Sequence, residues 1–222
     1  MKRVSKTLYR RAAAAAAALT LSLTLFCVSG ADKEGESSSL DDLDFIEMIN
    51  SVDTGKASDL IQQFQAKEAK NRLLNGRYNP KGECTVESFR NKEVLLLTIP
   101  AHLLFAPNDT TLKAGASEYL QPIKRYLRTP DMYRVLLVMH TDNTGSDRYR
   151  DEITASRVNS VVDWFESEGA DTDYLFSYAM ADEMPLKANT SMENRDANRR
   201  LEIYLMPGEK MVEQAKKGRI AF

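Results

Sequence analysis

The stretch from residue 135 to residue 157 constrains the fold more than any other part of this chain. Four apolar residues at 135–138 predict a buried strand, and a polar loop at 142–147 follows that is rich in turn-forming residues. An amphipathic pattern typical of a helix carries the chain away from the loop. In an α/β layer, the carboxyl end of a strand and the free amides at the start of the next helix face one crevice, where ligands bind. The stretch therefore predicts an α/β domain with a polar site at this loop.

Two opposite charges flank the predicted crevice. Asp142 lies at the end of the strand, and Arg157 lies about two to three turns into the helix. Charges so placed can hold a zwitterion, because the carboxylate accepts an ammonium group and the guanidinium forks onto a carboxylate. The alternative is that Asp142 caps the loop and that Arg157 is an exposed helix residue. Spacing alone leaves both readings open.

Hydrophobic periodicity in the rest of the chain predicts alternating strands and helices. Strands at 84–89 and 94–99, joined by a turn at 90–92, form a predicted hairpin. Pro122 is expected to kink the next helix or to start a second segment. The remaining predicted elements are a helix presenting Leu112, Ala116, Leu120, Ile123 and Leu127, strands at 133–139, 175–180 and 201–205, a helix at 147–168 and a short helix ending at 198. These units predict a two-layer α/β sandwich with helices on one face of the sheet.

The run HTDNTGSDRYRDEITASR, residues 140–157, resembles the central motif of the OmpA-like carboxy-terminal domain, the peptidoglycan-associating module of cell-envelope proteins. The family writes this motif as G-H-T-D-x-x-G-x-x-x-Y-N-x-x-L-S-x-x-R. Residues 195–203 resemble its closing R-x-x-N-R-R-V-E-I motif, and Phe105 and Leu112 match its F-x-x-x-x-x-x-L opening. Within the central motif the matching residues are His140, Thr141, Asp142, Gly145, Tyr149 and Arg157. The three motifs stand at the correct mutual spacing within residues 84–206.

This resemblance implies both a fold and a ligand. The fold is the family's βαβαββ-type mixed sheet with helices on one face. The family's roles imply that Asp142 receives the ammonium of diaminopimelate in the peptidoglycan stem peptide and that Arg157 receives its carboxylate. Amides of the loops at 105–110 and 142–145 are expected to assist. The candidate peptidoglycan-binding residues are Asp142, Arg157, Asn143, Thr144, Phe105, Asn108, Arg150 and Arg195.

Three positions depart from the family pattern. Arg150 replaces an Asn that helps to hold the ligand, Met139 replaces a Gly, and Ala181 stands where the family often has Gly. The central charge pair is retained, so we expect binding to be weakened or shifted to another stem peptide rather than abolished. The alternative is an OmpA-like fold that has lost its affinity for peptidoglycan and acts as a protein-interaction scaffold.

Other polar residues of the motifs are expected to have structural roles. His140 should fix loop hydrogen bonds, because no nucleophile motif accompanies it. Asn198, Arg199 and Arg200 should brace the loop and the last strand. We therefore expect a non-enzymatic protein, and the rival from another class is a wall hydrolase that uses Asp142 as its base.

The first thirty residues predict export. Five basic residues precede an apolar stretch at 12–28, and small residues follow, which is the pattern of a secretory signal. Cleavage before Ala31 is one reading. Lipidation of Cys27 is a second, although bulky Phe26 stands where a small residue is expected, and an uncleaved but short anchor is a third. All three place the rest of the chain outside the cytoplasm, so we expect a periplasmic or outer-membrane-associated protein.

The segments on either side of the domain have distinct compositions. Residues 31–42 are acidic and rich in Ser and Gly, which indicates a flexible linker. Helical patterns at 43–51 and 58–76 either pack on the domain or act as a spacer. The predicted organisation is a signal at 1–30, a linker with a helical extension at 31–80, the OmpA-like domain at 84–206 and a charged tail at 207–222.

Charge and composition exclude several partners. The formal net charge is −2, and removal of the first thirty residues leaves 25 Lys and Arg against 32 Asp and Glu. This balance argues against nucleic acid, because phosphate binding needs clustered positive charge. With 2 His and 2 Cys and no cofactor motif, neither a metal nor a cofactor is predicted. The expected partners are peptidoglycan and, through a lipid anchor or a partner protein, the outer membrane; the oligomeric state is left open.

Overall fold

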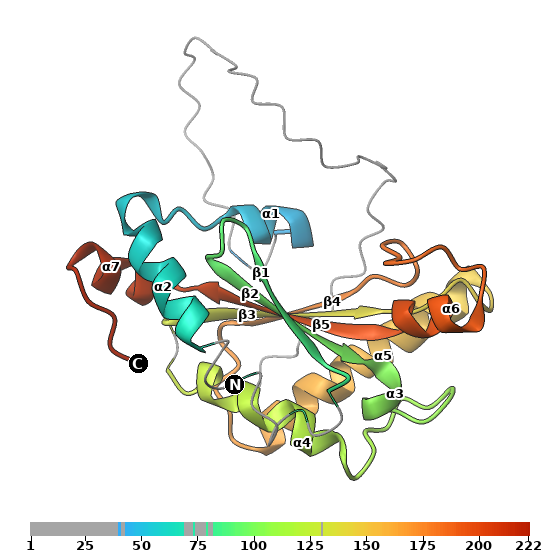
Figure 1. The fold of residues 1–222 in the computed structure, drawn as a ribbon. Coiled ribbons are helices and arrows are strands. Elements are labelled where there is room, and N and C mark those ends of the chain that lie inside the picture. Colours follow the sequence, from blue (N-terminus) through green and yellow to red (C-terminus); the bar gives the residue numbers. More distant parts are fainter. Residues whose placement is uncertain (1–39, 41–42, 69–72, 74–78, 80–81, 130) are drawn as a thin grey trace, which may run out of the picture.

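The structure is a computed structural model of the chain, and it describes residues 40, 43–68, 73, 79, 82–129 and 131–222. The predicted signal at 1–30 with Cys27, most of the predicted linker and the end of the second predicted helix lie outside these residues. Figure 1 shows the described part as one twisted sheet with helices packed around it.

A five-stranded mixed sheet forms the centre of the fold. Its strand order is β1-β2-β5-β3-β4, with β3 and β4 parallel and the other neighbours antiparallel. The central strands β3 and β5 are buried along their whole length, as expected for strands covered on both faces. The strands are β1 (Thr85–Phe89), β2 (Val94–Pro100), β3 (Tyr133–His140), β4 (Leu175–Ala179) and β5 (Arg200–Pro207). The mixed α/β fold that the sequence predicts is confirmed.

Helices cover one face of the sheet with an apolar layer. α4 (Ala116–Leu120) continues directly into the 3-10 helix η4 (Gln121–Leu127), and α5 (Asp147–Ser167) packs beside β3 and β4. Pro122 stands in the first turn of η4, where its missing N–H costs no hydrogen bond. Pro122 therefore starts a second segment, which is one of the two outcomes expected from the sequence. The buried layer includes Leu120, Ile123, Leu137, Met139, Val158, Phe165 and Ile203.

Leu112 differs from its prediction as a helix residue. It pairs with Phe105 in an isolated antiparallel bridge, ahead of α4. The N–H of Lys113 donates to the carbonyl of Leu104 at 2.9 Å, which closes the intervening loop on itself. The loop begins at the end of α3 (Ala101–Leu104). Because residue 112 pairs with residue 105 in a strand-like bridge, it is not part of the helix that begins at residue 116.

The opposite face of the sheet carries α1 (Phe45–Asn50). Phe45 and Met48 are buried there with residues of the central strands. The ring of Phe45 meets the rings of Tyr178 and Tyr204 edge to face, at centroid distances of 5.8 and 5.3 Å. Aromatic pairs in this geometry add stabilisation beyond the area that they bury. The first of the two predicted N-terminal helices thus packs on the domain, so helices lie on both faces of the sheet and not on one face as the sequence predicts.

Two arginines hold the end of α1 against the sheet. Arg90, in the turn between β1 and β2, donates to the carbonyl of Ile49 at 2.9 Å and to that of Val52. Arg134 of β3 donates to Ser51 Oγ at 2.9 Å. Cations at the end of a helix oppose its dipole, and donors there satisfy its last carbonyls. A six-residue helix, too short to be stable alone, is fixed in this way.

α2 (Ser58–Glu68) is joined to the sheet by a buried amide. Gln65 Nε2 donates to the carbonyls of Glu93 at 2.8 Å and Leu205 at 3.1 Å, and Gln65 Oε1 accepts from the hydroxyl of Tyr133 at 3.1 Å. Both N-terminal helices therefore pack on the domain rather than acting as a spacer. The remaining elements are the 3-10 helix η2 (Gly55–Ala57), α6 (Met192–Asn198) and α7 (Glu209–Lys216), the last formed by the charged tail.

Gly208 ends β5 where two backbone segments nearly touch. A Cβ atom at this position would lie 2.1 Å from the carbonyl oxygen of Asp131. The approach is fixed, because Gly208 N–H donates to Met132 and Lys210 N–H donates to Asp131, at 2.9 and 3.0 Å. We predict that Gly208→Ala lowers the free energy of unfolding by about 2–3 kcal/mol, the size expected of overpacking. Urea unfolding followed by circular dichroism measures this loss.

Gly115→Ala is the matched control for this substitution. A Cβ atom on Gly115 meets nothing within 4 Å, and its φ of −82° suits any residue. We expect its free energy of unfolding to stay within about 0.5 kcal/mol of the wild type. Equal losses in the two variants would contradict the steric explanation.

Candidate functional site

The loop after β3 lies at the carboxyl end of a parallel strand pair. β3 and β4 run in the same direction, so their carboxyl ends meet at one edge of the sheet. The N–H of Thr141 donates to the carbonyl of Ala181 at 2.7 Å and ties the loop after β3 to the segment after β4. Ser146 caps α5 by accepting from the N–H of Tyr149 at 3.2 Å. This is the strand, loop and helix arrangement that the sequence predicts here.

Asp142 is a buried carboxylate with all of its bonds made inside the protein. Its Oδ1 accepts from Thr144 N at 2.7 Å and from Thr144 Oγ1, and its Oδ2 accepts from Arg199 Nη1. Burial acts to raise the pKa of Asp142, but the hydrogen bonds from Thr144 and the charge of Arg199 outweigh it and lower that pKa. Asp142 is therefore ionised at neutral pH although its exposed fraction is 1%.

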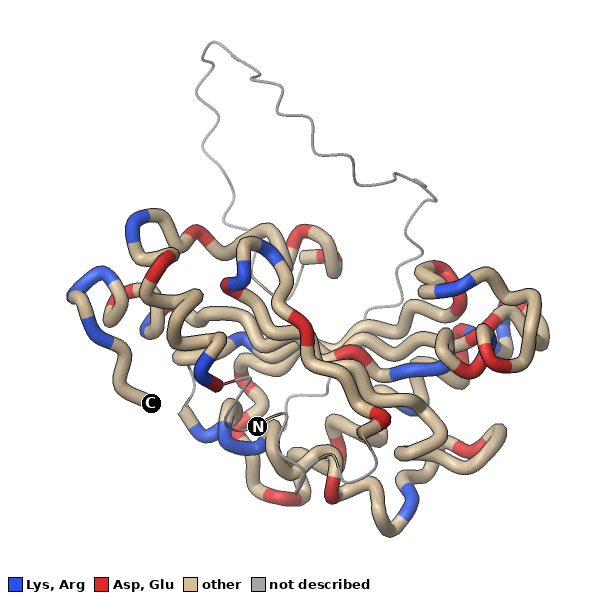
Figure 2. Tube along the Cα trace, in the orientation of Figure 1, with Lys and Arg blue, Asp and Glu red and all other residues tan. Residues whose placement is uncertain are grey.

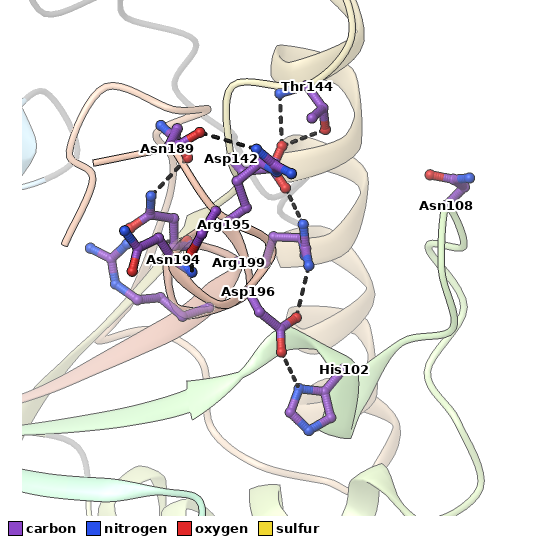
Figure 3. Close-up of polar contacts among 12 residues, drawn as sticks. His102, Asn108, Asp142, Thr144, Asn189, Asn194, Arg195, Asp196 and Arg199 are labelled. Atoms are coloured by element: carbon purple, nitrogen blue, oxygen red, sulfur yellow. Dashed lines mark hydrogen bonds and ion pairs between the residues drawn. The ribbon is translucent and has the colours of Figure 1, made fainter. Parts of the chain in front are cut away.

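Arg199 connects Asp142 to a chain of further charged groups. Its Nη2 donates to Asp196 Oδ1 at 2.8 Å, and Asp196 Oδ2 lies 3.9 Å from His102 Nδ1. His102 Nε2 lies 2.8 Å from Glu83 Oε2. Figure 3 shows Thr144, Asp142, Arg199, Asp196 and His102 as one continuous row. In Figure 2, positions of both charge signs gather around α6, which contributes Asp196.

Arg157 is buried on α5 and is held by the loop between Phe105 and Leu112, called the opening loop below. Its Nε donates to the carbonyl of Asp109 at 2.9 Å and its Nη2 to that of Ala106 at 3.2 Å. Its guanidinium carbon lies 4.9 Å from the centroid of the Phe105 ring, within cation–π range. Burial lowers the pKa of Arg157, and the nearby charge of Arg199 lowers it further. An arginine nevertheless remains a cation at neutral pH.

Asp142 and Arg157 are close to the same arginine but are not bonded to each other. Within the described residues no hydrogen bond or ion pair joins them, and Arg199 is the ion-pair partner of Asp142. Arg199 was expected from the sequence only to brace the loop and the last strand. It does brace them, and it is also the group that neutralises the central carboxylate of the site.

Arg150 organises the loop that carries Asn143. Its Nε donates to Asp182 Oδ1 at 2.7 Å, its Nη2 lies 2.5 Å from Asp147 Oδ1, and its Nη1 donates to the carbonyls of Gly145 at 2.7 Å and Asn143 at 3.5 Å. Burial acts to lower the pKa of Arg150, but the two carboxylates outweigh it and raise that pKa. The cation that replaces the family's Asn is therefore compensated by two anions.

The other predicted residues are divided between two loops. Asn108 Oδ1 accepts from the hydroxyl of Tyr149 at 2.9 Å, which links the opening loop to α5. Asn108 stands apart from the row of charged groups in Figure 3. Phe105 is buried and supports Arg157, whereas Arg195 on α6 donates to the carbonyl of Asn189 at 3.1 Å. Asn143, Thr144 and Asn108 are exposed and within reach of a ligand, while Phe105 is not.

The local structure explains why a glycine stands at position 145 of the motif. Its φ is +85°, and a Cβ atom there would lie 2.7 Å from Cδ1 of Tyr149. Glycine alone adopts this conformation without cost and leaves room for the ring. The ring of Tyr149 thus packs over the backbone of the loop at Gly145, where a side chain would collide with it.

Sequence reasoning missed the roles of Arg199, Asp196 and Tyr149 in this site. The signal for Arg199 was present in the closing motif, where two arginines are adjacent at the junction of α6 and β5. Neighbouring residues at the start of a strand point to opposite sides. Arg199 accordingly reaches Asp142, whereas Arg200 reaches Glu202 at 2.7 Å.

A buried polar cluster adjoins the site at the end of β3. His140 Nε2 lies 3.3 Å from Glu202 Oε2, which also accepts from the hydroxyl of Tyr204 at 2.7 Å. Burial lowers the pKa of His140. Burial acts to raise the pKa of Glu202, but hydrogen bonds and charges from His140, Arg200 and Tyr204 outweigh it and lower that pKa. His140 thus bonds to a residue of β5 and not, as the sequence predicts, to the loop, and its Nδ1 has no hydrogen-bond partner among the described residues.

Both lowered pKa values predict a loss of stability in acid. The unfolded chain protonates His140 below about pH 6.5 and Glu202 below about pH 4.5, whereas the native state resists both protonations. The free energy of unfolding should therefore fall as the pH is lowered from 7 to 3. Glu202→Gln should cost about 3 kcal/mol at pH 7, because it leaves the buried Arg200 without its carboxylate, and should flatten the decline below about pH 4.5. Urea titrations across this pH range measure both effects.

Glu118→Gln is the control for this experiment, because it removes the same charge from an exposed helix position. Its stability should follow the wild-type curve at every pH. A decline below pH 4.5 that is equally steep in Glu202→Gln and wild type would show that Glu202 does not carry the acid sensitivity.

The described residues contain no group of three or more His, Cys, Asp or Glu side chains placed to hold a metal ion. No helix among them is long and apolar enough to cross a membrane.

Residues 104–199 match the sequence model of the OmpA family. The chain contains an OmpA-family domain. YiaD of Escherichia coli K12, described as a probable lipoprotein, is 25% identical over 118 residues, which cover 53% of this chain and 54% of YiaD. ArfA of Mycobacterium tuberculosis H37Rv, described as a peptidoglycan-binding protein, is 28% identical over 103 residues, which cover 46% of this chain and 32% of ArfA. The chain thus spans about half the length of YiaD and a third of ArfA.

Solved structures share the fold of this domain. A putative MotB-like protein from Desulfovibrio vulgaris superposes with a TM-score of 0.60 at 23% identity, covering 68% of this chain and 99% of that chain. The OmpA-like fold expected from the three sequence motifs is therefore confirmed.

Proposed function

We propose that this protein binds peptidoglycan through its OmpA-family domain and so associates with the wall within the cell envelope. ArfA, which is 28% identical to this chain over 103 residues, is described as a peptidoglycan-binding protein. The signal predicted at 1–30 supports export, and the similarity to YiaD, a probable lipoprotein, supports a membrane-associated envelope protein. Periplasmic or outer-membrane-associated localisation follows from the same proposal, with Cys27 as the residue that a lipid anchor would use.

The ligand group in this proposal is the zwitterionic end of diaminopimelate in the stem peptide. The observation that carries it is a pair of opposite, buried charges, Asp142 and Arg157, that do not form an ion pair with each other. The ammonium of the ligand goes to Asp142 and its carboxylate to Arg157. Exposed Thr144, Asn143 and Asn108 supply polar groups at the rim.

Modest affinity at one site suffices for this role. A charge-assisted hydrogen bond contributes about 1.5–3 kcal/mol net. Two such contacts with loop amides support binding near micromolar, about −8 kcal/mol. Because the wall is a polymer that presents many copies of the stem peptide, weak contacts still retain the protein there.

The proposed role is non-catalytic. Asp142 has a lowered pKa and all of its oxygens bonded, whereas a general base needs a pKa near the working pH and access to a proton. Sacculi incubated with the protein should therefore release no soluble muropeptides. Release of muropeptides would instead favour the wall-hydrolase alternative.

A sacculus pull-down tests the binding site. We expect the wild-type chain to sediment with purified sacculi, and Asp142→Asn and Arg157→Gln each to weaken its retention about tenfold or more. Asp142→Asn keeps the side-chain shape and Arg157→Gln keeps a polar side chain without the charge, and circular dichroism checks that both variants are folded. Retention that survives both substitutions would contradict the site.

Arg148→Gln is the matched control, because it removes a cation from the exposed face of the same helix. Its retention should equal that of the wild type. A second candidate function, a protein-interaction scaffold without peptidoglycan affinity, is favoured by the internal bonds that already satisfy Asp142 and Arg157. A wild-type chain that stays in the supernatant would support this scaffold reading.

A further inference from the structure

The central carboxylate of the site is closed off by an arginine. Asp142 has an exposed fraction of 1%, whereas the side chain of Arg199 on top of it is 35% exposed. The other oxygen of Asp142 is held from within its own loop by Thr144. Arg199 is thus the partner of Asp142 that faces solvent, and the row in Figure 3 shows it between Asp142 and Asp196.

An ammonium group cannot reach Asp142 while Arg199 is in place. A carboxylate with almost no exposed surface has no free position for a second cation, so one donor has to leave before another enters. The Thr144 donors lie two residues away in the same tight loop, and their departure would unfold that loop. The guanidinium of Arg199 lies at the end of a long flexible side chain, so it is the donor that can be exchanged.

We propose that Arg199 is a displaceable latch on Asp142, which the ammonium of the ligand must replace. This inference rests on the proposed peptidoglycan-binding function and adds a control step to that site. The exchange breaks one ion pair and forms another, so the number of charge pairs on Asp142 is unchanged. The latch therefore lowers the net affinity without removing it, and it selects for a ligand that brings its own cation.

The released arginine keeps a partner. Arg199 Nη2 already donates to Asp196 Oδ1 at 2.8 Å, so Asp196 retains the guanidinium after Nη1 has left Asp142. The charge of Arg199 also acts on Arg157 and lowers its pKa, which places the two cations within electrostatic range. A ligand carboxylate that binds Arg157 relieves this repulsion. A zwitterion thus compensates both charges that the exchange disturbs.

Arg199→Gln tests the latch directly. Calorimetric titration of the full chain with a synthetic stem peptide that contains meso-diaminopimelate should give about tenfold tighter binding in this variant, the value of one charge-assisted contact that no longer has to be broken. Arg199→Lys, which restores a cation, should return the affinity toward the wild type. Arg148→Gln, with the same change of net charge on an exposed face, should bind as the wild type does.

A second probe separates displacement from general electrostatics. The same peptide acetylated on the side-chain amine of diaminopimelate has no ammonium group to replace Arg199. Its affinity should not rise in Arg199→Gln. A rise that is equal for both peptides would show a general charge effect and would overturn the latch.

The outcomes distinguish the latch from the proposed function. If the wild type binds the peptide and Arg199→Gln binds equally or more weakly with its fold intact, the latch is wrong and peptidoglycan binding stands. If Arg199→Gln alone binds, the latch is supported in its strongest form. If neither binds, both proposals are overturned.

Discussion

The desolvated carboxylate of Asp142 is the group on which the arrangement of the site depends. A buried anion is tolerated only where hydrogen bonds and a counter-charge replace the water that it has lost. Thr144 supplies bonds from the loop itself, and Arg199 supplies the charge from the junction of α6 and β5. One carboxylate therefore joins the end of a central strand to a segment more than fifty residues further along the chain.

Several arginines of this fold hold a loop or a helix end by donating to its backbone carbonyls. Arg157 fixes the opening loop through two of its carbonyls, Arg150 fixes the loop after β3, and Arg90 fixes the end of α1. Guanidinium groups suit this task because several donors in one plane satisfy neighbouring carbonyls at the same time. The site is consequently rich in cations, yet few of them are free of internal acceptors. In the proposed function, a ligand therefore exchanges partners with internal acceptors rather than filling an empty position.

Much of the fold could be predicted from the sequence because local and long-range signals agree. Continuous apolarity marked β3, Pro122 marked the break between α4 and η4, and turn-forming residues marked the loop after β3. The placement of α1 could not be predicted, because six residues with three buried side chains carry little periodic signal. Its position is decided by Arg90 and by the aromatic rings on the second face of the sheet.

The sequence named the candidate residues of the site, but it did not show that Arg199 forms the ion pair with Asp142. Asp142 and Arg157 carry opposite charges at suitable spacing, and nothing local says that a third charge enters. The choice between Arg157 and Arg199 as partner of Asp142 depends on where α6 ends and on which side of β5 each arginine leaves the backbone. Those are properties of the assembled sheet, since β5 lies between β2 and β3 although it is the last strand in the chain.

The hydrogen bonds from Arg90 and Arg134 to the end of α1 also set the route by which tension enters the molecule. A pull on the chain ahead of residue 43 reaches α1 before any strand, and Arg90 and Arg134 couple this helix to the β1–β2 turn and to β3. The helix would have to peel away, parting Phe45 from Tyr178 and Tyr204, before the load moved on to α2. The short helix can thus lengthen the chain under strain while the sheet and its loop keep their shape.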